Sequence, residues 1–247
     1  MYATPPWWPT AIALTTTNRV PWWQVGDADE RPERWTVHID VTDNNGAAPC
    51  PDDVRRVGVI ELAVAELAAD PQLLHPAAAG SWAPEFLAEA LTQPGSGALV
   101  DELDLLLAPG PARVVLLRSV YLHEAWRGCG LAPPLLSAAL RRFSAMARLA
   151  ACRVDPTDIA ELAPGLTPAE AEDVAQRAGW LLERSGFVPW NDVHLVGLHN
   201  PAHQAHQHQL AQDVTSAELE DALDDAITTD TDDGRDGEGT SPGPEHP

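Results

Sequence analysis

Residues 112–147 read ARVVLLRSVYLHEAWRGCGLAPPLLSAALRRFSAMA, and this stretch decides the fold. An apolar run is followed by a turn that contains Gly128 and Gly130, and then by apolar residues that recur at 3.6-residue spacing. The pattern predicts a strand, a glycine turn and an amphipathic helix whose first turn meets the glycines. Because a helix amino terminus has unpaired N–H groups and a partial positive charge, this turn is suited to hold a phosphate.

The rest of the chain predicts further strands and helices around this unit. Alternation of apolar and polar residues is clearest from Trp35 to Thr42 and predicts an extended strand with one apolar face. The predicted elements are the strands 11–17, 34–42, 58–67, 149–154 and 193–198 and the short helices 84–92 and 100–107. No Gly-Lys-Ser/Thr follows the glycine turn, which excludes a nucleotide P-loop.

The glycine turn, Arg127-Gly128-Cys129-Gly130-Leu131-Ala132, resembles the Arg/Gln-x-x-Gly-x-Gly/Ala motif of the GNAT (GCN5-related N-acetyltransferase) superfamily. Residues 179–187, GWLLERSGF, are similar to the signature of that family's last helix, which ends in Gly-Phe. The resemblance covers residues 112–198 and includes the order of elements between the two motifs. It implies an α/β fold with a GNAT-like central mixed, mostly antiparallel, splayed sheet flanked by helices.

The same resemblance implies a binding site for coenzyme A. The pantetheine arm is expected to meet backbone groups at Val120, Tyr121 and Leu122. The pyrophosphate is expected to meet the N–H groups of the turn that Arg127 starts, which belong to Gly128, Cys129, Gly130, Leu131 and Ala132. The function implied is transfer of an acyl group from acetyl-CoA, or another acyl-CoA, to an amine.

Transfer to an amine requires a base, and three residues near strand ends are candidates: Glu124, His123 and Asp155. Each also has a simpler interpretation, since Glu124 and His123 suit a solvated turn and Asp155-Pro156 commonly begins one. Cys129 suggests a nucleophile because a thiol at a helix amino terminus has a lowered pKa, but the family offers no precedent for that role.

The chain departs from the family at three positions. Many relatives have an Asn and a Tyr in the last helix where this chain has Ala175 and Leu182, and Pro133 removes one N–H from the first helical turn. An alternative function therefore stays open: a catalytically inactive GNAT-like scaffold that binds coenzyme A or another protein. The first hundred residues also differ, because several strands precede the motif where the family has a helical pair.

Composition limits the partners. The formal net charge of −22 disfavours binding to nucleic acid and to anionic membranes, and it favours a cationic amine acceptor, either a small molecule or a peptide. No apolar run is long enough to cross a membrane, and the three separated cysteines fit the reducing cytoplasm. A second copy of the chain, forming a homodimer, stays open as a partner.

We divide the chain into four parts. Residues 1–33 form a Trp/Pro-rich segment, in which the Trp pairs at 7–8 and 22–23 suit buried packing better than a ligand groove, and residues 34–198 form the acyltransferase domain. Residues 199–212 are interpreted as a His/Gln linker, and residues 213–247 as an acidic, largely disordered tail with a short helix at 216–227. The histidines of the linker predict no metal site, because no acid or Cys accompanies them at ligand spacing.

Overall fold

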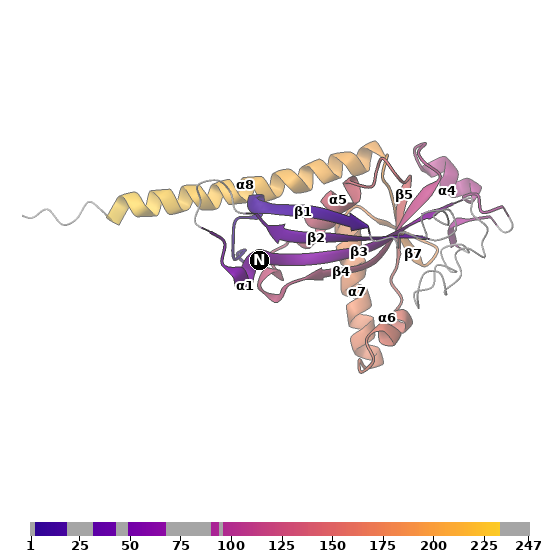
Figure 1. The fold of residues 1–247 in the computed structure, drawn as a ribbon, viewed down its shortest axis with the longest axis horizontal. Helices are drawn as coiled ribbons and strands as arrows, with labels where there is room; N and C mark the ends of the chain where they lie inside the picture. The colour runs from indigo at the N-terminus through magenta and orange to yellow at the C-terminus, as the bar shows by residue number, and fades with distance from the viewer. Residues whose placement is uncertain (1–2, 19–31, 43–48, 68–89, 94–95, 233–247) are drawn as a thin grey trace, which may run out of the picture.

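The protein has an α/β fold with an open, mostly antiparallel mixed sheet flanked by helices (Figure 1). The computed structural model describes residues 3–18, 32–42, 49–67, 90–93 and 96–232. Seven strands occur in the order β1-β2-β3-β4-β5-β7-β6. Their bounds are β1 Ile12–Asn18, β2 Glu33–Val41, β3 Arg56–Glu66, β4 Arg113–Leu122, β5 Leu149–Arg153, β6 Val188–Trp190 and β7 Val193–Gly197. Among these strands only β4 and β5 pair in parallel, and the other five neighbouring pairs are antiparallel.

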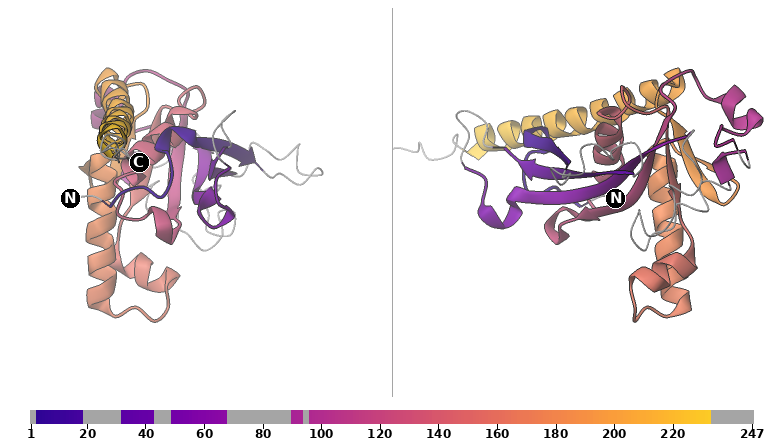
Figure 2. Two further views of the ribbon diagram at one scale, coloured as in Figure 1. Left: turned by 90° about the vertical axis from the view of Figure 1, so that its left-hand side faces the viewer. Right: turned by 45° about the vertical axis from the view of Figure 1, so that its right-hand side comes forward.

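Helices cover both faces of this sheet. The helical segments are η1 Pro9–Ala11, α1 Asp52–Arg55, α4 Asp101–Leu106, η5 Glu124–Trp126, α5 Ala132–Arg141, α6 Pro156–Leu162, α7 Pro168–Arg184 and α8 Pro201–Asp232. Residues of α5 and α7 share one core with β2, β3 and β4, and α8 packs against α5 on the same side (Figure 2). On the opposite face, Leu103 of α4 packs with Val114 of β4 and Leu149 of β5. The single crossover helix between the two parallel strands is α5, which fixes where the glycine turn lies.

Local signals account for the start and the end of α7. Thr167 and Glu170 form a capping box, in which each side chain accepts a hydrogen bond from the backbone N–H of the other. At the other end, Gly186 has a φ of 92° and its N–H donates to Glu183, while the N–H of Phe187 donates to Leu182. This is a Schellman motif, so the Gly-Phe pair in the sequence has a structural cause as a helix stop.

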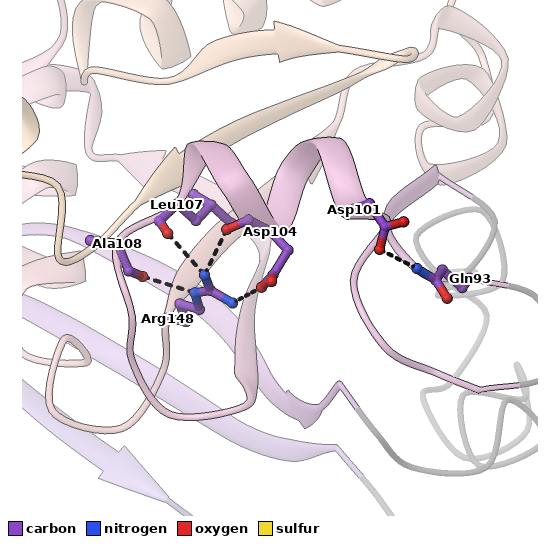
Figure 3. A network of polar contacts seen from close by, with 6 residues as sticks. All are labelled: Gln93, Asp101, Asp104, Leu107, Ala108 and Arg148. Carbon is purple, nitrogen blue, oxygen red and sulfur yellow. Dashed lines mark hydrogen bonds and ion pairs between the residues drawn. The ribbon is translucent and has the colours of Figure 1, made fainter.

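Arg148, the residue before β5, holds the end of α4 (Figure 3). The Arg148 side chain pairs with the Asp104 carboxylate, and its guanidinium donates to the backbone carbonyls of Asp104, Leu107 and Ala108 at 2.8–3.0 Å. These carbonyls end α4, where a cation is favoured. The N–H of Arg148 also donates to the carbonyl of Arg113 at 2.9 Å, so one residue joins α4, β4 and the start of β5.

Most predicted elements are confirmed. The five strands expected at 11–17, 34–42, 58–67, 149–154 and 193–198 correspond to β1, β2, β3, β5 and β7, and the helix expected at 100–107 corresponds to α4. Of the helix expected at 84–92, residues 84–89 lie outside the described residues, as do the Trp pair at 22–23 and the tail from 233 onward. No helix within the described ranges has the length and apolar character that a membrane crossing requires.

The structure adds to the predicted division of the chain at two places. Within residues 1–33, β1 pairs along its whole length with β2 and belongs to the same sheet as the rest of the domain. Residues 199–212 are not a flexible linker, because α8 begins at Pro201 and runs through them to Asp232, and the helix expected at 216–227 is part of it. The linker interpretation failed because His203 is a core residue: its side chain is 5% exposed, and Gln207 bridges it to the carbonyl of Ser137 on α5.

Candidate functional site

The site lies where the parallel strands β4 and β5 separate. Their pairing covers three residues, from Val114 opposite Leu149 to Leu116 opposite Ala151, although β4 continues to Leu122. Just beyond this point Arg118 is an extra residue in β4, because Leu117 pairs with Leu62 whereas Ser119 pairs with Glu61. A bulge of this kind bends a strand, and the carboxyl ends of parallel strands are where open α/β sheets bind ligands.

The unpaired edge of β4 presents the backbone of alternate residues. The N–H of His123 donates to the carbonyl of Val57 at 2.8 Å, so His123 and, two residues earlier, Tyr121 direct their backbone groups toward β3. The close approach of the Tyr121 carbonyl to Gly58 on β3 agrees with this. Val120 and Leu122 therefore direct their N–H and C=O groups toward the side on which β5 has separated.

Trp126 fixes the turn that follows β4. Its side chain is fully buried, and the indole Nε1 donates to the carbonyl of Val54 at 2.9 Å. Next to it, exposed Arg127 folds back over the end of β4: its Nε donates to the carbonyl of Leu122 at 2.9 Å, and its guanidinium lies 5.2 Å from the centre of the Tyr121 ring. The N–H groups of Trp126 and Arg127 donate to the carbonyls of His123 and Glu124, so this first part of the turn is held by its own backbone as well as by side chains.

The glycines place these N–H groups at the start of α5. Gly128 and Gly130 have φ angles of 79° and 76°, which other residues rarely adopt. None of the N–H groups of residues 128–132 donates to an acceptor in the part of the chain that the structure describes. Pro133 and Pro134 have no N–H, so all the free donors at this helix end come from the turn.

The three helices that follow α5 in the chain differ from it in this respect, although α1 and α4 also have no side-chain cap. The side chain of Asp155 caps α6, the side chain of Thr167 caps α7, and the side chain of Asn200 accepts from the N–H of Ala202 at the start of α8. By contrast, α5 has Leu131 at its N-cap and no side-chain cap. Its amino terminus is therefore available to an external anion, whereas those of α6, α7 and α8 are occupied from within.

The structure places the three candidate bases at two different strand ends. His123 and Glu124 follow β4, where Glu124 is exposed and His123 has a buried Nδ1 without a partner among the described residues. Asp155 follows β5, where it accepts from the N–H of Thr157 and pairs with Arg153 at 2.8 Å. The hydrogen bond from Arg153, assisted by that from Thr157, lowers the pKa of Asp155, which makes it a weak base.

Cys129 lacks the environment of a nucleophile. Its side chain is 9% exposed, its Sγ lies 3.7 Å from the carbonyl of Thr4, and burial raises the pKa of the thiol. The position at a helix amino terminus predicts the opposite shift, but desolvation outweighs it here because the thiol points into the protein.

The last helix offers no acid at the positions where the resemblance expects one. Ala175 and Leu182 are 7% and 2% exposed, and Leu182 belongs to the core between α7 and the sheet. The histidines of α8 take part in helix packing, and within the described ranges no group of His, Cys, Asp or Glu could hold a metal ion.

His194 is a partly buried histidine on β7, the neighbour of β5, that the sequence analysis did not single out. It lies on β7 directly opposite Cys152 of β5, and Gly179 of α7 leaves room above its imidazole. Burial lowers the pKa of His194, so the ring is neutral near pH 7, and its Nδ1 has no partner among the described residues. The sequence gives little sign of His194, because a single histidine in the last strand belongs to no motif. The one related feature is the small residue Gly179, which lies next to the His194 ring.

Comparison of the chain with models of known protein families and with curated proteins finds no match. The functional interpretation therefore depends on the geometry of the strand ends and on the chemistry of the turn. That geometry consists of an uncapped helix, a turn with free N–H groups at residues 128–132, and an adjacent unpaired strand edge at Val120 and Leu122.

Proposed function

We propose that this protein binds an acyl-CoA and transfers its acyl group to an amine, as the resemblance to the GNAT superfamily implies. The observation that carries the proposal is the turn at residues 128–132, whose N–H groups have no acceptor in the described part of the chain and lie at an uncapped helix start. A turn with only a structural role would be expected to satisfy these groups internally, as the starts of α6 and α7 do.

Diphosphate fits this turn despite the acidity of the protein. A hydrogen bond to a charged group contributes about 1.5–3 kcal/mol, and the turn offers several such donors. The net charge of −22 opposes an anion, but exposed charges more than about 8 Å away are largely screened at physiological ionic strength. Contacts made directly by the turn therefore outweigh the long-range repulsion.

The pantetheine arm fits the free edge of β4. An extended chain with amide groups can add to a strand edge as a further strand does, and Val120 directs its N–H and C=O to that edge. Leu122 offers less, because its carbonyl already accepts from Arg127. Of the three backbone positions that the resemblance implies, Val120 is thus the best placed, and Tyr121 faces β3.

The bound acyl-CoA supplies a thioester whose carbonyl an amine can attack. The chain's part is to hold the reactants at the separated strand ends and to accept a proton from the amine nitrogen. His123 and Glu124 are the candidates on the β4 side, and neutral His194 is a third group that can accept a proton. Asp155 is the weakest candidate because its carboxylate is engaged by Arg153 and Thr157.

A second candidate function is supported by the last helix. Ala175 and Leu182 are buried and apolar, so α7 provides no group to protonate a departing thiolate at the two positions where the resemblance expects one. This favours a protein that binds coenzyme A without turnover. Release of free thiol from acetyl-CoA over a panel of amines separates the two functions, since a binding scaffold gives release no faster than the buffer does.

Binding of coenzyme A is tested by adding a negative charge at the start of α5. Ala132→Asp places a carboxylate at the first residue of α5, where it stabilises the helix dipole but competes with diphosphate for the same N–H groups. We expect calorimetry with coenzyme A to show at least a tenfold (about 1.4 kcal/mol) loss of affinity for Ala132→Asp. Ala132→Asn is the matched neutral control and is expected to stay within about threefold of the unmodified protein. Equal affinities for the two variants, or no binding by the unmodified protein, would contradict the proposal.

A further inference from the structure

The amino-terminal segment, defined here as residues 3–8, contacts the glycine turn. The N–H of Ala3 donates to the carbonyl of Gly128 at 3.0 Å, and the thiol of Cys129 lies against the carbonyl of Thr4. Both contacts join residues that are more than a hundred positions apart in the sequence. Nothing in the resemblance to the GNAT superfamily assigns a role to this segment.

Peptide geometry fixes which side of the turn the segment occupies. The bond between Gly128 and Cys129 is trans, and in a trans peptide the C=O of one residue and the N–H of the next point in opposite directions. Because the Gly128 carbonyl points at Ala3, the N–H of Cys129 points away from the segment. The segment therefore lies on the carbonyl side of this peptide and does not cover the Cys129 N–H.

The other end of the segment is anchored in the core. Trp7 packs against the main core cluster, and the carbonyl of Trp8 accepts from the N–H of Ala11, which is 3% exposed. The short helix η1 that follows packs against α8. With Pro5 and Pro6 restricting the backbone between the anchor and Ala3, the donor at Ala3 has little freedom to leave the turn.

We infer that residues 3–8 are part of the diphosphate-binding site: Ala3 holds the Gly128–Cys129 peptide in the orientation that directs the Cys129 N–H toward the ligand. The inference rests on the proposed binding of coenzyme A and extends it to a segment outside residues 112–198. Ala3 is a positioning residue in this scheme, since it touches the turn and not the ligand.

Replacement of a single N–H tests the inference. Ala3→Pro removes the donor, whereas Ala3→Ser keeps it, and Ala3 is exposed, so neither change disturbs the core. Losing one hydrogen bond of about 1 kcal/mol corresponds to roughly a fivefold weaker affinity for coenzyme A. We expect this loss for Ala3→Pro and not for Ala3→Ser, with melting temperatures that differ by no more than about 4 °C. Pantetheine, which has no diphosphate, is expected to bind both variants equally when titrated by calorimetry.

The outcomes separate this inference from the proposed function. Absence of coenzyme A binding in the unmodified protein would overturn both. Binding by the unmodified protein with equal or tighter binding by Ala3→Pro would overturn the inference alone, and tighter binding would mean that the segment covers the site. A weaker affinity of Ala3→Pro for pantetheine as well would also overturn it, since the effect would not be on the diphosphate.

A second readout needs no ligand. If Ala3 holds the turn, its loss should expose Cys129, whose thiol is shielded at the carbonyl of Thr4. We expect alkylation of Cys129 by iodoacetamide, followed by peptide mass spectrometry, to be several-fold faster in Ala3→Pro than in Ala3→Ser. Cys50 is 4% exposed and serves as the internal control. Equal rates at Cys129 in the two variants would overturn the inference.

Discussion

The carboxyl ends of β4 and β5 belong to one parallel pair, yet they are held in different ways. At the end of β5, Arg153 pairs with Asp155 at 2.8 Å and with Asp158 at 3.4 Å, and Asp155 also caps α6. At the end of β4, the turn is held by the buried indole of Trp126, and the start of α5 has no side-chain cap. At the end of β5 the polar side chains pair with one another, whereas the end of β4 is held by burial of the Trp126 side chain.

The difference shows how a protein keeps backbone donors free for a ligand. A turn needs some interaction to hold its shape, and if its own N–H groups supply that interaction, they are lost to a ligand. Burial of Trp126 provides the restraint at the end of β4, so the N–H groups of residues 128–132 are spared. At the end of β5 the polar groups are used internally instead. We therefore expect the two ends to respond differently to mutation and to pH.

The largest effect is expected at Trp126. Trp126→Ala removes a fully buried side chain and should lower the free energy of unfolding by about 3–5 kcal/mol, as measured by chemical denaturation. Trp180→Ala on α7 is the matched control, because that indole is 57% exposed, and its effect should stay below about 1 kcal/mol. Similar losses for the two variants would show that the turn is not anchored by burial.

A smaller effect, dependent on pH, is expected at Asp155. Its folded-state pKa is lowered below the usual value of 3.8 by Arg153 and Thr157, so ionisation of the carboxylate favours the folded state. The stabilisation is present above pH 3.8 and is lost as the pH falls through the folded-state pKa. Asp155→Asn keeps a capping side chain but has no charge, so it should be less stable than the unmodified protein by about 0.5–1 kcal/mol at pH 7.

The pH series itself distinguishes the two strand ends. Unfolding measured from pH 2.5 to pH 7 should show the difference between Asp155→Asn and the unmodified protein shrinking toward zero at the acidic end. A difference that stays constant across the range would mean that the ion pair with Arg153 contributes nothing and that capping alone matters.

The sequence was sufficient to predict elements whose pattern is local. Alternation predicted β2, and the glycine turn followed by 3.6-residue spacing predicted α5. The positive φ angles of Gly128 and Gly130 follow from the same turn. The resemblance to the GNAT superfamily, which includes the order of these elements, implied a mixed, mostly antiparallel sheet, and the structure has one.

Other features depend on contacts that no local pattern encodes. His203 looked like part of a polar run, because a helix that buries few of its side chains shows little apolar periodicity. The hydrogen bond between Ala3 and Gly128 joins residues that are far apart in the sequence. The pairing of β4 with β5 ends just before a bulge at Arg118. Neither position has a residue type that signals the contact.

The smallest effect is expected at Arg127, which joins the turn to the end of β4 from the surface. Arg127→Ala removes an exposed hydrogen bond to Leu122 and a contact with the Tyr121 ring, so the free energy of unfolding should fall by less than about 1 kcal/mol. Arg127→Lys keeps the charge without the planar guanidinium and should recover only part of this loss in thermal denaturation. A loss in Arg127→Ala as large as that in Trp126→Ala would show that a surface contact, and not a buried indole, holds the turn, and the contrast between the ends of β4 and β5 would then disappear.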